Sequence, residues 1–245
     1  MAEKFSVGTT SVWKSDRTPV TEADTQINEL VLNALRRHYP HIHVISEEGN
    51  GEVDGAEYRI LCDPLDGTFA FMYGLPISSF CISVLRENTV LSSVIYDPFC
   101  KRMWSADRGK GAFLNGAPTR VNVIDGITKP NPVNVCIVWW QGCYYNMHAV
   151  AGEVMAANMH VMQPMTIALC GGLIASGTLE ATVFPGQRGW ETAAMGLIVE
   201  ESGGKVTDIH GNPVQYGPTA EIEGHIISNG TLVHNSLVDI VRRCQ

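Results

Sequence analysis

The stretch YRILCDPLDGT, residues 58–68, carries the strongest fold signal in this chain. Its first five residues form a largely apolar run that is typical of a buried strand, and Asp63 ends the run. Pro64 has no N–H group, so we expect strand pairing to stop there. Gly67 permits a close backbone approach, and the residues after it are expected to begin a helix. The stretch therefore predicts a strand, a turn and a helix, with Asp63 and Asp66 at the edge of a sheet.

Two carboxylates beside a helix start suit a hard cation and a phosphate. Mg²⁺ prefers oxygen ligands and usually bridges one or two carboxylates to a phosphate group, and free N–H groups at the start of a helix hold anions. The plainer interpretation is a strand that ends in an ordinary Asp-capped turn. A covalent aspartyl-phosphate intermediate is not expected, because phosphatases of the haloacid dehalogenase type use acids two residues apart, whereas Asp63 and Asp66 are three apart.

An amphipathic helix is predicted upstream of this stretch. Thr21 suits its N-cap, and the negative charge of Asp24 in the first turn suits the helix dipole. Apolar residues then recur at helical spacing: Ile27, Leu30, Val31, Ala34 and Leu35. A short β-branched strand over residues 43–46 follows and ends at a pair of acids, Glu47 and Glu48.

The pattern changes along the rest of the chain. Strands are expected over residues 79–85, 89–96, 103–106, 112–114 and 120–123. Glycine and two prolines interrupt residues 125–132, which are the best candidate for a linker. Beyond the linker, strands (133–138, 181–184, 225–228) alternate with helices (147–159, 166–175, 190–202, 232–243). We therefore predict an α+β half over residues 1–124 and an α/β half over residues 125–245.

The composition excludes several classes of protein. The chain has 245 residues, of which 45% are apolar, a net charge of −8 and a pI of about 5.4. Without a basic block it is a poor candidate for binding nucleic acid. We see no apolar leader and no long uncharged apolar run. We therefore expect neither secretion nor a membrane span. An acidic surface would repel a phosphorylated substrate unless a bound cation reversed the local charge.

Taken in order, the acidic segments resemble the inositol monophosphatase family of metal-dependent, lithium-sensitive sugar phosphatases. D-P-x-D-G-T and W-x-x-A-A…E-x-G-G are the two signature motifs of that family. The resemblance covers the chain from about Lys14 to its end. It rests on these matching segments: PVTEAD (19–24), SEEG (46–49), DPLDGT (63–68), GKGAFLNG (109–116), WETAA (190–194) and EESGG (200–204).

The resemblance implies a layered αβαβα sandwich with the site between an α+β half and an α/β half. It implies a phosphomonoesterase that uses metal-activated water and binds two or three Mg²⁺ ions per site. The substrate would be a small phosphorylated metabolite, a polyol or sugar phosphate, with inositol monophosphate as the default. We further expect a cytoplasmic homodimer with no nucleic-acid or membrane partner.

The resemblance also implies roles for individual residues. The metal ligands would be Glu47, Asp63, the Leu65 carbonyl, Asp66 and Glu191. The catalytic residues would be Asp24 and Thr68, which orient the attacking water, and Glu47. The substrate would be bound by Asp66, by the backbone of Gly67 and Thr68, and by Arg188.

Three features depart from the family's pattern. Glu191 stands where the second signature usually has Asp, which lengthens the side chain by one methylene. The thirteen residues before Lys14 are too few for the long helix that members usually carry there. Inositol-specific members have an acid that grips ring hydroxyls where this chain has Phe184, and their R-x-x-G-[ST]-A segment is here QPMTIA (163–168). The phosphate end of the site thus looks intact, while the sugar end does not.

These departures leave alternatives open. Arg188 would meet a second phosphate if the substrate were fructose 1,6-bisphosphate or a 3′-phosphonucleotide, although a surface Arg in a loop is the plainer interpretation. The chain could also be a non-catalytic relative that binds metal or a partner, but the retention of Asp24 and Thr68 argues against this. The aromatic pairs at 139–140 and 144–145 are expected to pack in the core or at an interface rather than against a substrate.

Overall fold

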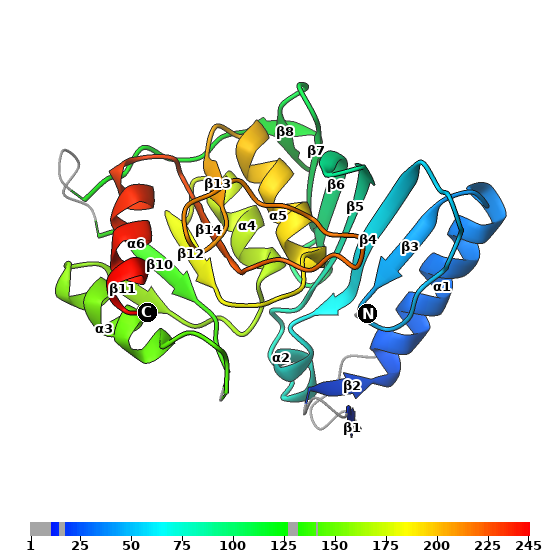
Figure 1. The fold of residues 1–245 in the computed structure, drawn as a ribbon, viewed down its shortest axis with the longest axis horizontal. Coiled ribbons are helices and arrows are strands. Elements are labelled where there is room, and N and C mark those ends of the chain that lie inside the picture. The colour runs from blue at the N-terminus through cyan, green and yellow to red at the C-terminus, as the bar shows by residue number, and fades with distance from the viewer. Residues whose placement is uncertain (1–10, 15–17, 127–131, 141) are drawn as a thin grey trace.

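The computed structural model describes residues 11–14, 18–126, 132–140 and 142–245. Figure 1 shows five layers side by side. In order they are α1 (Glu22–His38), a seven-stranded sheet, α4 (Ala168–Ala175) with α5 (Trp190–Glu201), a five-stranded sheet, and α3 (Met147–Ala156) with α6 (Leu232–Arg243). The predicted αβαβα sandwich is therefore confirmed.

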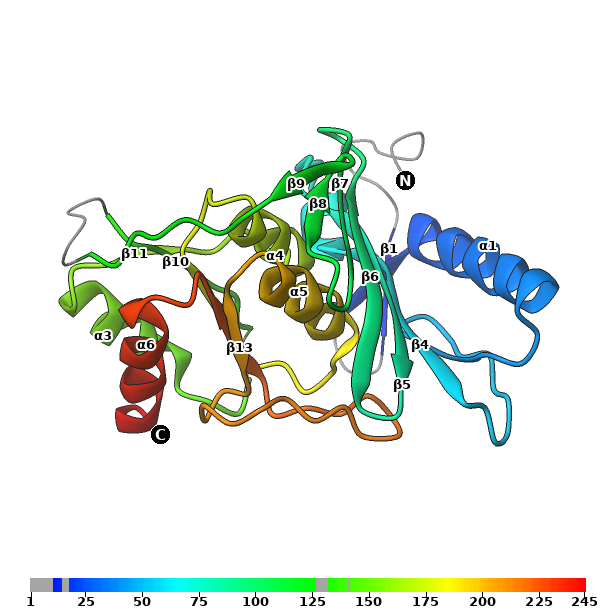
Figure 2. The same cartoon turned by 90° about the horizontal axis from the view of Figure 1, so that it is seen from above.

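The seven-stranded sheet is built by consecutive strands of the first half of the chain. In spatial order they are β3 (His43–Ser46), β4 (Tyr58–Asp66), β5 (Ser79–Arg86), β6 (Thr89–Asp97), β7 (Arg102–Asp107), β8 (Ala112–Leu114) and β9 (Ala117–Thr119). β3 and β4 are parallel, and all later neighbours are antiparallel. Because side chains alternate along a strand, one face packs on α4 and α5 while the other carries α1 (Figure 2).

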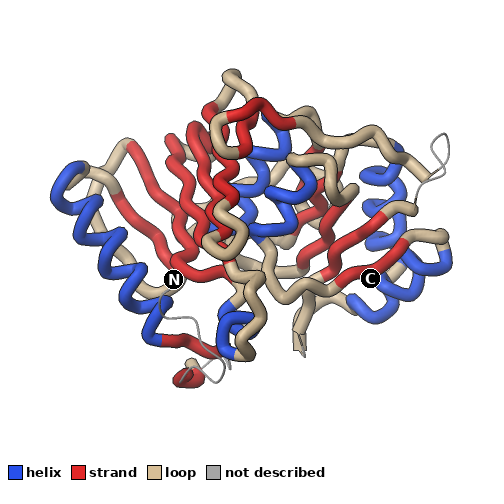
Figure 3. The backbone as a smooth tube through the Cα atoms, turned by 180° about the vertical axis from the view of Figure 1, so that it is seen from behind, coloured by secondary structure: helices blue, strands red, loops and turns tan. Residues whose placement is uncertain are grey.

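The five-stranded sheet has mixed directions. In spatial order it runs β11 (His160–Met162), β10 (Asn134–Ile137), β12 (Ala181–Phe184), β14 (His225–Ser228) and β13 (Lys205–Thr207). β10 is parallel to both of its neighbours, and β14 is antiparallel to both. Figure 3 shows α4 and α5 enclosed between the two groups of strands. Three short elements complete the fold: β1 (Ser11–Trp13), β2 (Pro19–Thr21) and α2 (Thr68–Met72).

Helices α4 and α5 form the centre of the core. Every residue of α5 from Glu191 to Val199 is buried, as expected for a helix that packs on all sides. Gly172 of α4 permits the close packing, because a Cβ there would lie 2.6 Å from the ring of the fully buried Trp104. Because α5 is buried, Glu191 in its first turn lies in the interior of the protein.

Local signals start α1 where the sequence predicted. Thr21 is its N-cap, and Thr21 and Asp24 form a reciprocal capping box. Asp24 is buried, with 1% of its surface exposed, beneath the helix start. The cap therefore turns a carboxylate toward the sheet instead of toward solvent.

The last predicted strand of the first half was wrong in position. Residues 120–123, all of which the structure describes, form no strand, and β9 lies at Ala117–Thr119 instead. Asn122 explains the difference, because its side-chain amide donates to Glu180 of the second half at 2.7 Å. The chain leaves the sheet here to join the two halves.

The strand that carries DPLDGT runs further than predicted. Pro64 does not end β4, because Asp66 pairs with Ser79 after a register shift that follows Asp63. A bulge of this kind redirects the side chains beside it. Here it redirects two predicted metal ligands.

Two helices are shorter than predicted, since the one expected over 166–175 begins at Ala168 and the one expected over 147–159 ends at Ala156. The three-residue strands β1, β2, β11 and β13 were not predicted, because so few residues show no periodicity.

Residues 127–131 of the predicted linker lie outside the described residues, and the division of the chain after residue 124 stays a prediction. Among the helices that the structure describes, none has the length and apolar character of a membrane span.

Candidate active site

Three buried carboxylates from distant parts of the chain meet at one point. Asp63 and Asp66 lie on either side of the bulge in β4, and Glu191 lies in the first turn of α5. One oxygen atom of each lies within 4.8 Å of the others. The structure thus brings together three of the side chains that the sequence predicted as metal ligands.

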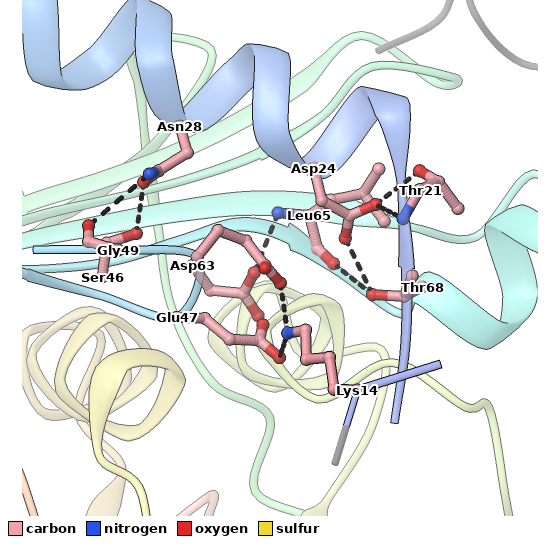
Figure 4. Close-up of polar contacts among 11 residues, drawn as sticks. Lys14, Thr21, Asp24, Asn28, Ser46, Glu47, Gly49, Asp63, Leu65 and Thr68 are labelled. Atoms are coloured by element: carbon pink, nitrogen blue, oxygen red, sulfur yellow. Dashed lines mark hydrogen bonds and ion pairs between the residues drawn. The ribbon is translucent and has the colours of Figure 1, made fainter. Parts of the chain in front are cut away.

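Glu47 reaches the same sheet edge from β3. Because β3 and β4 are parallel with Ser46 opposite Cys62, the next residue along β3 emerges beside Asp63. The N–H of Glu47 donates to the Cys62 carbonyl at 3.2 Å, and Figure 4 shows the Glu47 and Asp63 side chains next to each other. The parallel pair therefore places a fourth acid at the site.

The acids oppose one another's ionisation. Burial raises the pKa of Asp63 well above its usual range, and the charges of Glu47, Glu191 and Asp66 raise it further. The pKa of Glu191 is also raised, first by burial and then by Asp66 and Glu47. Desolvation raises the pKa of Glu47 to about 7, although the Lys14 ammonium opposes this shift. A bound cation would relieve the repulsion.

The donor set fits a hard divalent cation. The three clustered side chains offer oxygen ligands, which Mg²⁺ prefers. Oε2 of Glu191 is buried and has no hydrogen-bond partner among the described residues, although buried polar atoms normally have one. A Mg²⁺ ion held by Asp63, Asp66 and Glu191 would supply the missing partner.

Lys14 is a site residue that the sequence analysis missed. Its ammonium lies 3.2 Å from Oε1 of Glu47 and also contacts Glu48 (Figure 4). Burial alone would lower the pKa of Lys14, but the two carboxylates outweigh burial and raise it. In the sequence Lys14 is the first residue of a polar loop, and nothing local signals a partner 33 residues away.

Thr68 and Asp24 are 44 residues apart, yet their side chains meet (Figure 4). The Thr68 hydroxyl donates to Oδ1 of Asp24 at 3.0 Å and lies 3.1 Å from the Leu65 carbonyl oxygen. Oδ2 of Asp24 accepts from the Thr21 N–H at 2.8 Å and from the Thr21 hydroxyl. One carboxylate therefore caps α1 and holds Thr68, and burial raises its pKa.

Gly67 forms the turn between β4 and α2. Its φ of +85° lies in the left-handed region that favours glycine. A Cβ at this position would lie 3.1 Å from Cβ of Thr166 and 3.2 Å from the carbonyl oxygen of Met165. The turn predicted to hold the phosphate thus packs closely on the segment that precedes α4.

Asp66 is held by the start of α4, about 100 residues further along the chain. Its Oδ2 accepts from the Ala168 N–H at 2.8 Å, from the Ser79 hydroxyl at 3.0 Å and from the Thr166 hydroxyl. Its Oδ1 accepts from the Ile167 N–H at 2.9 Å. Ile167 is the N-cap of α4 but has a wholly apolar side chain, so Asp66 supplies the acceptors that a capping residue normally supplies.

The segment before α4 brings a further hydroxyl to the acids. Met165 has a φ of +61°, in the left-handed region. The hydroxyl of the following Thr166 donates to Oδ2 of Asp66. The sequence analysis noted this segment only as an altered family motif, so it missed Thr166 as a site residue.

Arg188 lies near the acids but has a partner. Its guanidinium lies 3.3 Å from the Glu221 carboxylate, and half or more of each side chain is exposed. It lines a cavity of about 580 Å³ together with Glu47, Lys14 and Trp190. The cavity connects Arg188 to the edge that carries Glu47, while its contact with substrate stays a prediction.

Comparison with known proteins shows the family of this chain. The profile of the inositol monophosphatase family matches residues 1–244. A histidinol-phosphatase of Chlorobaculum parvum is 29% identical and an inositol-1-monophosphatase of Mesorhizobium japonicum 27% identical, over 93% and 91% of this chain and 85% and 83% of theirs. The crystal structure of the extragenic suppressor protein suhB from Bartonella henselae superposes with a TM-score of 0.85 at 24% identity, covering 96% of this chain and 91% of that one. The chain therefore belongs to the inositol monophosphatase family.

Proposed function

We propose that this protein is a Mg²⁺-dependent phosphomonoesterase that acts on a small phosphorylated metabolite. One observation carries the proposal: Asp66, one of the buried acids that fit a cation, lies two residues before Thr68, whose hydroxyl donates to the Asp24 carboxylate. A protein that only bound metal would need the acids but not the pair. Membership of a phosphatase family supports a hydrolase.

We assign each residue of the site a role in the reaction from its position. Bound Mg²⁺ would activate water and stabilise the leaving alkoxide, and its proposed ligands are Glu47, Asp63, the Leu65 carbonyl, Asp66 and Glu191. The Thr68 hydroxyl would orient the attacking water, and Asp24 would accept the proton of that hydroxyl. Burial raises the pKa of Asp24, which makes its carboxylate a stronger proton acceptor than an exposed one.

The phosphate group has its own proposed contacts. The backbone N–H groups of Gly67 and Thr68 would cradle it, which requires the close approach that a glycine permits. The relatives named above, a histidinol-phosphatase and an inositol-1-monophosphatase, both take phosphate esters of small alcohols by name. Inositol monophosphate is the family default, but Phe184 replaces the acid of inositol-specific members, so the proposal stops at the class of small phosphomonoesters.

The alternatives have less support. A bisphosphorylated substrate would require Arg188 to exchange its ion pair with Glu221 for the second phosphate. In a non-catalytic relative the hydrogen bond between Thr68 and Asp24 would only hold the start of α2 against α1. Lithium sensitivity, a cytoplasmic location and a homodimer belong to the proposal as properties expected from the family.

Phosphate release from a panel of esters tests the proposal. The panel contains inositol 1-phosphate, histidinol phosphate, fructose 1,6-bisphosphate, a 3′-phosphonucleotide and glycerol 2-phosphate, each with Mg²⁺ and with EDTA. We expect Mg²⁺-dependent release that Asp63→Asn abolishes. A folded protein that binds Mg²⁺ but releases no phosphate from any ester would favour the non-catalytic alternative, and Glu191→Asp would then show whether the longer side chain is the cause.

A further inference from the structure

Three parallel strands of the second sheet end at the edge that faces the acidic site. β10, β11 and β12 run in the same direction, so their carboxyl ends share one edge, which is where α/β sheets bind ligands. The segment after β11 reaches Asp66 through Thr166, and the segment after β12 leads to Glu191 at the start of α5. The carboxyl ends of β11 and β12 therefore lead into the segments that reach the acids.

Two aromatic residues line this edge, and we name them the aromatic wall. Phe184 is the last residue of β12, and Trp140 follows β10. Their ring centroids are 6.0 Å apart with the planes tilted by 53°. Phe184 is buried, whereas 48% of the surface of Trp140 is exposed. The sequence predicted that Trp139 and Trp140 pack in the core or at an interface, and core packing alone does not account for an indole whose surface is 48% exposed.

Buried neighbours fix the wall relative to the acids. His225 packs on Phe184 with centroids 5.4 Å apart. Its Nδ1 lies 2.8 Å from the hydroxyl of Thr192, the residue after Glu191. Burial lowers the pKa of His225 to about 3, so the imidazole is neutral near physiological pH. His225 thus links the aromatic wall to α5, the helix that carries Glu191. The ring that packs on Phe184 is an uncharged imidazole.

A polyol finds poor partners beside such a wall. Phe184 stands where the inositol-specific pattern has a carboxylate. Hydroxyls pressed against apolar surface lose their hydrogen bonds to water without replacing them. A planar ring gains contact area and quadrupole attraction from the same surface.

We infer that the substrate is a phosphomonoester whose alcohol carries a planar aromatic ring, which stacks on the exposed face of Trp140 while the phosphate lies at the acids. This inference rests on the proposed function and names the substrate class of that same site. Esters of ring-bearing alcohols, carbocyclic or heteroaromatic, are substrates, and esters of polyols are poor ones.

Paired esters and paired variants test the ring. We compare 2-phenylethyl phosphate with inositol 1-phosphate, since both are esters of unactivated alcohols and do not differ through an acidic leaving group. We expect kcat/KM to be about 10-fold higher for the phenylethyl ester, and Trp140→Ala to lower it about 10-fold while inositol 1-phosphate changes by less than about 2-fold. Tyr144→Ala removes a ring that is 85% exposed and outside the wall, and this control should leave both values unchanged.

A binding measurement separates this inference from the proposed function. Calorimetry with 2-phenylethylphosphonate, which is not hydrolysed, in the presence of Mg²⁺ should show about 10-fold weaker binding for Trp140→Ala than for Tyr144→Ala. That result without turnover of any ester would support the wall while the phosphatase function failed.

Three results would contradict the inference of a ring-bearing substrate without contradicting the proposed phosphatase function. The two esters could have equal kcat/KM, or Trp140→Ala could lower both values equally. Alternatively, Trp140→Ala could dissociate an oligomer while the turnover of each ester stayed the same, which would make the wall an interface.

Discussion

The carboxylate of Asp66 accepts the backbone N–H of Ala168 at 2.8 Å, which joins the seven-stranded sheet to the start of α4. Asp66 therefore caps a helix of the second half while it stands among the proposed metal ligands. Asp63, its neighbour in the cluster, accepts instead from the Leu65 N–H of its own turn, at 2.8 Å. Asp63 and Asp66 are both proposed metal ligands, but only Asp66 also caps a helix of the second half.

Replacing Asp66 and Asp63 in turn by Asn should separate helix capping from metal binding. Asp66→Asn places an NH₂ group among the four donors that face the carboxylate, which costs about 2 kcal/mol and lowers Tm by roughly 4–8 °C. Asp63→Asn removes a charge from a repelling cluster, so Tm of the metal-free protein should stay equal or rise. Both variants should lose Mg²⁺ binding. Thermal unfolding in EDTA checks the contrast, and equal losses in Tm would contradict the capping role of Asp66.

Gly67→Ala should be far more damaging than a matched glycine substitution elsewhere. Gly67 and Gly55 have positive φ values, +85° and +67°, so alanine costs about 1–2 kcal/mol of backbone strain at either position. At Gly55 no other described atom lies within 4 Å of the added Cβ, whereas at Gly67 it meets Thr166 and Met165. We expect Gly55→Ala to keep full activity and Gly67→Ala to lose at least about 100-fold in kcat, because the turn must shift.

Thr68→Ala should lower the rate without weakening metal binding. The hydroxyl that it removes bonds to Asp24 and is proposed to orient the water, a contribution of about 10²–10⁴-fold. Thr68→Ser keeps the hydroxyl and should retain most of kcat. Steady-state kinetics with a Mg²⁺ titration separates the effects, and a Thr68→Ala variant with normal kcat would remove Thr68 from the mechanism.

The metal-free protein should lose stability as the pH rises toward neutrality. The pKa of Glu47 is 4.5 in its unperturbed state and about 7 in the fold, so the folded protein binds more protons between these values and stability falls across this window. The raised pKa values of Asp63 and Glu191 act in the same direction. Because ligands must be deprotonated to bind metal, Mg²⁺ should raise Tm more at about pH 8 than at about pH 6. Glu47→Gln should reduce the difference, and an equal gain at both pH values would contradict this linkage.

Local sequence determined the pieces from which the site is assembled. The apolar run before Asp63, the capping pair Thr21 and Asp24, and the acid at the start of α5 each follow from patterns within a few residues. The order of these segments was enough to predict the layered fold and the family. Such patterns are readable because strand alternation, helix periodicity and capping act between neighbours in the chain.

Tertiary structure alone decided which polar atoms far apart in the sequence become partners. The capping of α4 by Asp66 joins residues about 100 apart, and the pairing of Lys14 with Glu47 joins residues 33 apart. The bulge in β4 and the left-handed Met165 likewise depend on strands and segments that pack against them. Hydrogen bonds and ion pairs act over a few ångströms in space and leave no periodic trace along the chain, so only the packed layers specify them.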